Sequence, residues 1–238
     1  LSYERIATLR AAGSTQRWAV FKHNLTESLH TRLSISSEIG VQGLINHLGQ
    51  ENAHYVVLRF FEKLPQLYRD GGDIDLLVSD EDERSVKSYL QLHPGPITVD
   101  VWTVSRKSFN DITYYPPPLA KSILASKQQG PAGAWVPAPR EALLSLIYHA
   151  LYHKGFFAGI PSSVSPKEVN QNPENDYVGA IRDQATALGI ALDLNMESLD
   201  EYLAQEGWRP KLDTLAKIAP RNKWVWRRFF SARDEEEM

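Results

Sequence analysis

The sequence predicts an α+β protein, in which a small mixed β-sheet with flanking helices is followed by an all-helical C-terminal domain. Short segments rich in β-branched and aromatic residues occur between residues 55 and 102, interrupted by one helical segment. From residue 140 onward, apolar residues recur at helical spacing and no further strand pattern follows. This order of elements is typical of a sheet packed against helices, with a separate helical part.

In the first half of the chain, residues 1–50 are expected to be mostly helical. One helix is expected over residues 36–48, with Ser36 or Ser37 as its N-cap. The three strands that follow are short and are separated by polar segments. They are expected at residues 55–61, 73–78 and 97–102, with a helix over residues 81–92 between the last two.

A proline-rich stretch at residues 114–118 is expected to divide the chain into an N-terminal domain, residues 1–118, and a helical domain, residues 119–238. A short helix is expected over residues 119–126. The long loop over residues 155–171 is a candidate lid, because loops of this length are commonly functional. The other expected helices cover residues 140–154, 175–188, 197–206 and 211–218, and a last one begins near residue 222.

Composition excludes several classes of protein. The 26 Lys and Arg against 29 Asp and Glu give a net charge of −3, which excludes a polycation. The absence of cysteine excludes disulfides, thiolate zinc sites and a cysteine nucleophile. Apolar runs are too short for a membrane span, and we expect a cytoplasmic protein. The first residue is Leu1 rather than Met, so we also allow for a larger parent chain or complex.

Three aspartates form the most informative pattern. Asp73 and Asp75 are two residues apart on an expected strand, so both carboxylates point to the same face. Asp100 lies on another expected strand and completes a three-carboxylate cluster if the two strands are neighbours. Adjacent carboxylates repel unless a cation lies between them, and an all-oxygen set suits Mg²⁺ or Mn²⁺. The alternative is a turn that carries solvated acids.

Residues 71–78, Gly-Gly-Asp-Ile-Asp-Leu-Leu-Val, are followed one helix later by Val-Asp-Val at residues 99–101. This pattern resembles the nucleotidyltransferase superfamily with the DNA polymerase β-like fold. It is most similar to uncharacterised bacterial families with the motif Arg-x-x-x-Asp-Ile-Asp-Leu-Leu-Val, whose arginine position Arg69 fills. The resemblance covers about residues 50–105.

The resemblance implies a nucleotidyltransferase core within residues 1–118 and Mg²⁺- or Mn²⁺-dependent transfer of a nucleoside monophosphate from an NTP to an acceptor hydroxyl. The catalytic metal ligands that it implies are Asp73, Asp75 and Asp100. Asp73 and Asp75 would bind both metals, and Asp100 would bind the metal that activates the acceptor. Of the acceptors, a small molecule or glycan precursor is favoured over nucleic acid.

The sequence departs from the superfamily in the region that holds the triphosphate. A glycine pair at a helix start usually supplies backbone amides there, but residues 58–65 contain no glycine. The guanidinium of Arg59 is a candidate replacement, because its fork matches phosphate geometry. The expected nucleotide-binding residues are Arg59, Arg69, Gly71, Gly72, His149, His153 and Lys154.

His149 and His153 are four residues apart on the expected helix and therefore share a face. They are candidates for binding phosphate or metal; the alternative is a pair of hydrogen-bonded interface histidines. A zinc-protease helix is excluded because Ala150, not Glu, follows the first histidine.

The C-terminal segment, residues 208–230, interleaves tryptophans with Lys and Arg. Such a pattern binds nucleic acid in some proteins, but a docked amphipathic helix has the same composition and is favoured here. Two other functions stay open for the whole chain. One is a non-catalytic nucleotidyltransferase-like module that binds a nucleotide or a protein, and the other is a toxin-type transferase that acts on RNA or protein.

Overall fold

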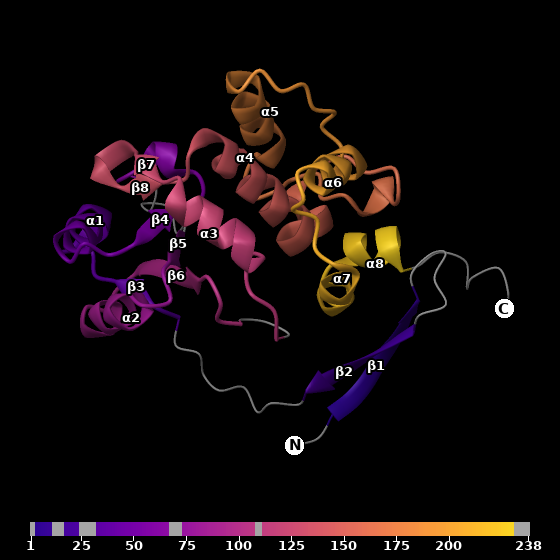
Figure 1. Ribbon diagram of the computed structural model, residues 1–238, viewed down its shortest axis with the longest axis horizontal. Helices are drawn as coiled ribbons and strands as arrows, with labels where there is room; N and C mark the ends of the chain where they lie inside the picture. The colour runs from indigo at the N-terminus through magenta and orange to yellow at the C-terminus, as the bar shows by residue number, and fades with distance from the viewer. Residues whose placement is uncertain (1–2, 11–16, 24–31, 67–72, 108–110, 231–238) are drawn as a thin grey trace, which may run out of the picture. The chain divides into compact units, whose positions relative to one another are not determined.

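The computed structural model describes residues 3–10, 17–23, 32–66, 73–107 and 111–230, and the protein is α+β as the sequence predicts (Figure 1). The chain forms two compact units. One contains residues 30–145, and the other contains residues 1–29 together with residues 146–238. The boundary expected after residue 118 falls inside the first unit, where helix α3 (Pro117–Ala125) lies against two strands of the sheet.

The first unit is built on a mixed four-stranded sheet. Its strands are β3 (Ser34–Ile35), β4 (Tyr55–Val57), β5 (Asp73–Val78) and β6 (Ile97–Thr103), in the order β3-β6-β5-β4. The central pair β5 and β6 is parallel, and both edge strands are antiparallel to their neighbours. The helix that connects the parallel pair is α2 (Glu83–Leu92), as a parallel crossover requires.

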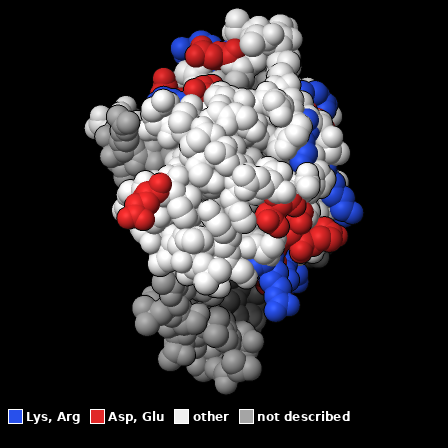
Figure 2. Space-filling view, turned by 90° about the vertical axis from the view of Figure 1, so that its left-hand side faces the viewer, with Lys and Arg blue, Asp and Glu red and all other residues white. Residues whose placement is uncertain are grey.

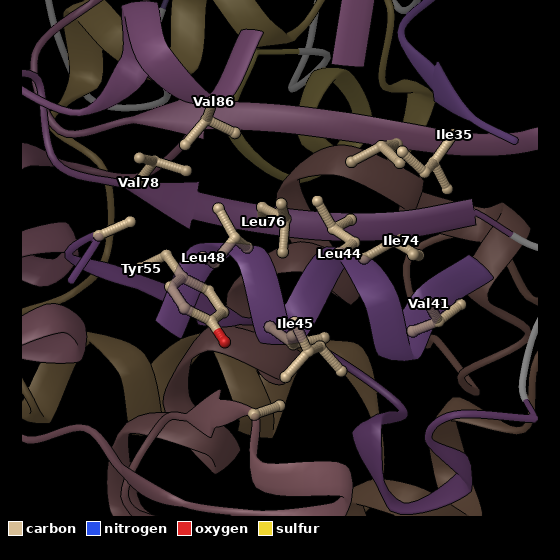
Figure 3. Close-up of a cluster of buried hydrophobic side chains, with 14 of the residues drawn as sticks. Ile35, Val41, Leu44, Ile45, Leu48, Tyr55, Ile74, Leu76, Val78 and Val86 are labelled. Carbon is tan, nitrogen blue, oxygen red and sulfur yellow. The ribbon is translucent and has the colours of Figure 1, made fainter. Parts of the chain in front are cut away.

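The core of this unit lies between one face of the sheet and helices α1 (Gly40–Gln50) and α2 (Figure 3). Ile74 and Leu76 of β5 point into it, where they meet α1 residues such as Leu44 and Leu48. Each of these four side chains is about 1% exposed, and burying one contributes about 1.5–3 kcal/mol. Because side chains alternate along a strand, this packing directs the aspartates of β5 to the opposite face.

The C-terminal end expected for the first strand needs correction. The composition predicts a strand over residues 55–61, but β4 ends at Val57, although the Leu58 amide still donates to the Asp75 carbonyl over 3.0 Å. Phe60 then adopts a left-handed backbone conformation with φ 51° and ψ 26°. This conformation costs a non-glycine residue roughly 1–2 kcal/mol and ends the strand, and a 3₁₀-helix follows at Phe61–Lys63.

The expectation of helices near the N-terminus is wrong. Strands β1 (Tyr3–Arg10) and β2 (Arg17–His23) form an antiparallel hairpin with a register shift between Arg5 and Ala7. The reason is composition, since residues 17–23 combine Trp, Val and Phe, which favour strands when a partner strand is present. A second short hairpin, of β7 (Gln128–Gln129) and β8 (Trp135–Val136), lies between the helices expected over residues 119–126 and 140–154.

From residue 146 onward, the regular secondary structure of the described residues is helical, and the helices lie close to the expected positions. Helix α4 (Pro139–Tyr148) continues into a π-helical segment, His149–Lys154. The later helices are α5 (Tyr177–Ala187), α6 (Met196–Gln205), α7 (Leu212–Ile218) and α8 (Lys223–Phe229). Three of them begin at side-chain N-caps, in which an Asp or Asn oxygen accepts a backbone N–H: Asp176, Asn195 and Asn222. In the part of the chain that the structure describes, no helix is long and apolar enough to cross a membrane.

Gly155 ends the π-helical segment at a place where only glycine fits. Its φ is +57°, and a Cβ there would lie 2.4 Å from the Asn222 side-chain oxygen. Asn222 in turn donates from Nδ2 to the Leu151 carbonyl over 2.8 Å and caps α8. The side chain of Asn222 therefore joins the end of the π-helical segment to the start of the last helix.

Candidate functional site

The three aspartates singled out by the sequence lie together. Strands β5 and β6 are parallel neighbours, with Asp75 opposite Asp100 and Asp73 opposite Thr98. Residues opposite each other, or two apart on one strand, point to the same face. Asp73, Asp75 and Asp100 therefore share the sheet face that points away from the core, and we call them the carboxylate site. Their side chains are 42%, 15% and 24% exposed, so a ligand can reach the site from solvent.

Arg32, which the sequence analysis missed, bridges two of these carboxylates. Its Nη2 atom lies 2.6 Å from Asp73 Oδ2 and 3.3 Å from Asp100 Oδ2. The hydrogen bond to Asp100 is the main cause that raises the pKa of the Arg32 guanidinium, and it outweighs the opposing effect of burial. The Arg32 side chain is 62% exposed. This contact therefore stands at the solvent-facing side of the site.

A second arginine pairs with the third carboxylate from the buried side. The Arg59 side chain is 4% exposed, and its Nη2 forms an ion pair with Asp75 Oδ2. Its Nη1 donates to the Tyr115 hydroxyl over 3.1 Å. Burial is the largest cause that raises the pKa of Tyr115 to about 12, so this phenol stays protonated and can donate to the Ser145 carbonyl. Arg59, expected to contact a nucleotide, is thus engaged with Asp75 and Tyr115.

Aromatic side chains fix the other oxygen of Asp75. The Trp102 indole N–H donates to Asp75 Oδ1 over 2.9 Å. The Trp102 ring stacks on Tyr114 with a centroid distance of 4.0 Å, and the Arg59 guanidinium carbon lies 5.5 Å from the centre of the Tyr114 ring. The two oxygens of Asp75 are therefore held in defined positions, one by Arg59 and the other by Trp102.

The carboxylate site carries more acid than base. Burial is the largest cause that raises the pKa of Asp100, and the negative charges of Asp75 and Asp73 raise it further against the effect of Arg32. Three carboxylates and two guanidiniums leave one net negative charge. A site with this net charge favours the binding of a cation.

The donors of the carboxylate site suit a hard divalent cation, because all of them are carboxylate oxygens. Among the described residues, no three His, Asp or Glu side chains are close enough to hold one ion. Asp73 and Asp100 both contact the same nitrogen of Arg32, so their two oxygens lie at most about 6 Å apart. Adjacent ligands of Mg²⁺, at about 2.1 Å from the ion, lie roughly 3 Å apart. For one ion to bind both oxygens, the two side chains would have to rotate toward each other once Arg32 is displaced.

The structure does not bring the remaining expected site residues together with the carboxylate site. Arg69, Gly71 and Gly72 lie outside the described residues. His149, His153 and Lys154 belong to the other unit, on the π-helical segment. There the buried ring of His149 hydrogen-bonds through Nε2 to the Tyr177 hydroxyl at 3.1 Å, and its centroid lies 5.6 Å from that of His153. The Lys154 ammonium lies 3.8 Å from Glu174. The hydrogen bond between His149 and Tyr177 agrees with the alternative given above, in which His149 is a hydrogen-bonded interface histidine and not a phosphate or metal ligand.

The basic and aromatic C-terminal segment is packed within its own unit. Trp224 is fully buried, and three of the segment's arginines pair with carboxylates. These pairs are Arg209 with Asp200 and Glu201, Arg227 with Glu168, and Arg228 with Glu201. On the face shown in Figure 2, charged side chains of the described residues form small, separate groups among uncharged ones. The burial of Trp224 and the ion pairs of these three arginines favour the docked-helix interpretation over a nucleic-acid surface.

Comparisons with known proteins add no relative. A scan against protein-family models gives no match, and searches of curated proteins and of solved structures find no significantly similar chain.

Proposed function

We propose that the protein is a metal-dependent nucleotidyltransferase that moves a nucleoside monophosphate from an NTP to an acceptor hydroxyl. The observation that carries this proposal is the arrangement of Asp73, Asp75 and Asp100 on one face of two parallel neighbouring strands. The two arginines beside these acids leave one net negative charge among the described residues, which favours the binding of a metal cation. Mg²⁺ or Mn²⁺, when bound, supplies charge neutralisation and polarisation of the transferring phosphoryl group.

The protein's own residues would divide the work. Asp73 and Asp100, the more exposed carboxylates, would bind the metal together with Asp75. Arg59 and Trp102 would hold Asp75 in one orientation, since each bonds one of its oxygens. Preorganised ligands of this kind reduce the reorganisation that the reaction requires. Following the sequence resemblance, Asp100 would bind the metal that activates the acceptor hydroxyl.

The acceptor we favour is a small molecule or a glycan precursor. Nucleic-acid acceptors require basic side chains that are available to phosphates. The arginines of the C-terminal segment that form ion pairs with Asp200, Glu168 and Glu201 are already neutralised. The donor is an NTP, and its base is identified by the experiment that follows.

The test uses the full chain, Mg²⁺ and each NTP labelled at its α-phosphate, with a small-molecule extract as the source of acceptors. Mass spectrometry then identifies any labelled product. The decisive variant is Asp73→Asn, because this side chain is 42% exposed and its loss leaves the buried pair intact. We expect labelling to fall by about 100-fold or more. Asp183→Asn, an exposed aspartate on α5, is the matched control and should label normally. Unchanged labelling by Asp73→Asn would contradict the proposal.

A second candidate function is a non-catalytic module that binds a nucleotide. It is favoured by the lack of glycine in residues 58–65 and by the burial of Arg59 against Asp75, because neither leaves an evident triphosphate cradle there. Thermal unfolding with each NTP, with and without Mg²⁺, separates the two functions. Stabilisation that needs Mg²⁺ and is lost in Asp73→Asn supports the transferase. Equal stabilisation of both proteins without Mg²⁺ supports the binding module.

A further inference from the structure

The two arginines of the carboxylate site occupy opposite environments. Arg59 is almost fully buried and also bonds Tyr115, so it is part of the packed interior. Arg32 is 62% exposed, and its guanidinium donates to Asp73 and Asp100. Breaking an exposed pair costs far less than breaking a buried one. Of the two guanidiniums, Arg32 is therefore the one that can leave.

Strand β3 does not depend on Arg32 for its place. Ser34 and Ile35 pair with β6, and the side chain of Ile35 is fully buried. The Ser34 hydroxyl accepts the Gly95 amide over 3.1 Å, and the Val99 amide donates to the Leu33 carbonyl over 2.9 Å. These contacts hold the backbone that carries Arg32, so its side chain can change partners without loss of the strand.

Charge counting shows what can replace Arg32. With both arginines in place, the site carries one net negative charge. A divalent cation added to that arrangement leaves a net positive charge, whereas a divalent cation in place of Arg32 leaves the site neutral. Neutrality is favoured in a partly buried cluster, because unpaired charge is costly there. Exchange of Arg32 for one divalent cation is thus the balanced change.

We propose that Arg32 occupies the cation position between Asp73 and Asp100 and exchanges it for a divalent metal that arrives with a nucleoside triphosphate, whose phosphates Arg32 then binds. A free metal ion has to displace the guanidinium into water. A metal–triphosphate complex brings an anion for the displaced guanidinium, whose planar fork suits phosphate oxygens. Arg32 thereby couples metal binding to nucleotide binding and supplies a phosphate contact in a chain without the glycine pair.

The nucleotide part of this inference rests on the proposed function, whereas the exchange of Arg32 for a metal does not. The first experiment therefore titrates the full chain with Mn²⁺ alone and measures free Mn²⁺ by electron paramagnetic resonance. Arg32→Ala should bind Mn²⁺ about 10-fold more tightly than the wild type, because the competing cation is gone. Arg32→Lys keeps the charge and should stay close to the wild type. Arg106→Ala removes another exposed arginine of the same unit, paired with Glu83, and should have no effect.

The second experiment titrates a preformed complex of Mn²⁺ with α,β-methylene ATP by calorimetry. Binding to Arg32→Ala should be about 10-fold weaker than to the wild type, the opposite direction from free Mn²⁺. Arg32→Lys should fall between the two, since an ammonium lacks the bidentate fork. Unchanged Mn²⁺ affinity in Arg32→Ala would overturn the exchange, and unchanged affinity for the complex would overturn the phosphate contact.

These outcomes are distinguishable from failure of the proposed function. A gain in Mn²⁺ affinity that disappears in Arg32→Ala/Asp73→Asn supports the exchange even if no NTP is turned over. Labelling that depends on Asp73, together with identical Mn²⁺ affinity in the wild type and Arg32→Ala, supports the transferase and overturns the role of Arg32.

Discussion

Among the described residues, two clusters of arginines and carboxylates, one in each unit, differ in charge balance and exposure. In the C-terminal helices, Asp200 is fully buried and accepts two hydrogen bonds from Arg209, over 2.9 and 2.6 Å, and one from the Tyr152 hydroxyl over 2.7 Å. Arg228 and Glu201 complete this set, which we call the Asp200 network. It contains two acids and two arginines and is therefore neutral.

The carboxylate site of the first unit has three acids and two arginines, and one of those arginines is exposed. Both clusters use the same chemistry, a carboxylate with a guanidinium. A neutral cluster around a buried carboxylate has no excess charge to attract a ligand, and it contributes to the fold. A cluster with excess acid at a solvent-facing strand pair has a net negative charge that attracts a cation. Charge balance and exposure together, and not the presence of an ion pair, indicate which cluster is a candidate for function.

The largest effect should come from the Asp200 network. Asp200→Ala removes the anion from Arg209 and the acceptor from Tyr152, and breaking such a buried pair costs about 3–5 kcal/mol. Urea unfolding followed by circular dichroism measures the loss. Glu201→Gln is the control in the same network, because Glu201 is 55% exposed, and it should cost less than about 1 kcal/mol. Equal losses in the two variants would contradict a distinction based on burial.

The next largest effect on stability should distinguish Asp75 from Asp73 within the carboxylate site. Asp75→Asn leaves the Arg59 guanidinium, 4% exposed, without its anion, and we expect a loss of about 2–3 kcal/mol. Asp73→Asn changes only an exposed pair with Arg32 and should cost less than about 0.5 kcal/mol. Urea unfolding of both variants checks this. If Asp75→Asn were as harmless as Asp73→Asn, Arg59 would not be part of the packed interior.

Local patterns of the sequence predict part of this arrangement. The strand at Asp73–Val78 is found at the expected residues, because its apolar side chains alternate with the aspartates and glycines precede it. The expected helix over residues 81–92 is found at Glu83–Leu92, with the Asp82 carboxylate bonded to the Ser79 hydroxyl just before it. In both cases the interactions that decide the structure lie within a few residues.

Other features depend on residues far apart in the chain. Arg32 is 41 residues from Asp73 and 68 from Asp100, and no local pattern marks it. Its place follows from the pairing of β3 with β6, which sequence periodicity does not reveal. The guanidinium of Arg59 suits phosphate, but in the structure it pairs with Asp75 and donates to the Tyr115 hydroxyl. The residue that follows it, Phe60, has a left-handed backbone conformation, and neither feature is visible in the local sequence. The N-terminal hairpin is a further case, because the strand-favouring residues 17–23 are stabilised as a strand by pairing with β1, and this pairing is not visible in the local pattern.

Glu197, at the start of α6, is a third case, because it is a single carboxylate whose hydrogen-bond donors are neutral. The Ser162 hydroxyl donates to Oε1 over 2.6 Å, the Ser163 amide to Oε2 over 3.1 Å, and the Trp224 indole to Oε1 over 3.3 Å. Burial alone would raise the pKa of Glu197, but these hydrogen bonds outweigh it and lower the pKa below the usual 4.5.

The smallest predicted effect follows from the sign of that shift. A carboxylate whose pKa is lowered by folding stabilises the protein above its unfolded pKa, near 4.5, and this contribution is lost as the pH falls through the lowered value. Glu197→Gln keeps the shape and one acceptor but removes the charge, so it should be less stable than the wild type at pH 7, by less than about 1 kcal/mol because solvent screens the group. The difference should shrink as the pH falls below about 4.5. Urea unfolding of both proteins at several pH values measures it. A difference independent of pH would mean that packing around Trp224, and not the ionised carboxylate, is what Glu197 contributes.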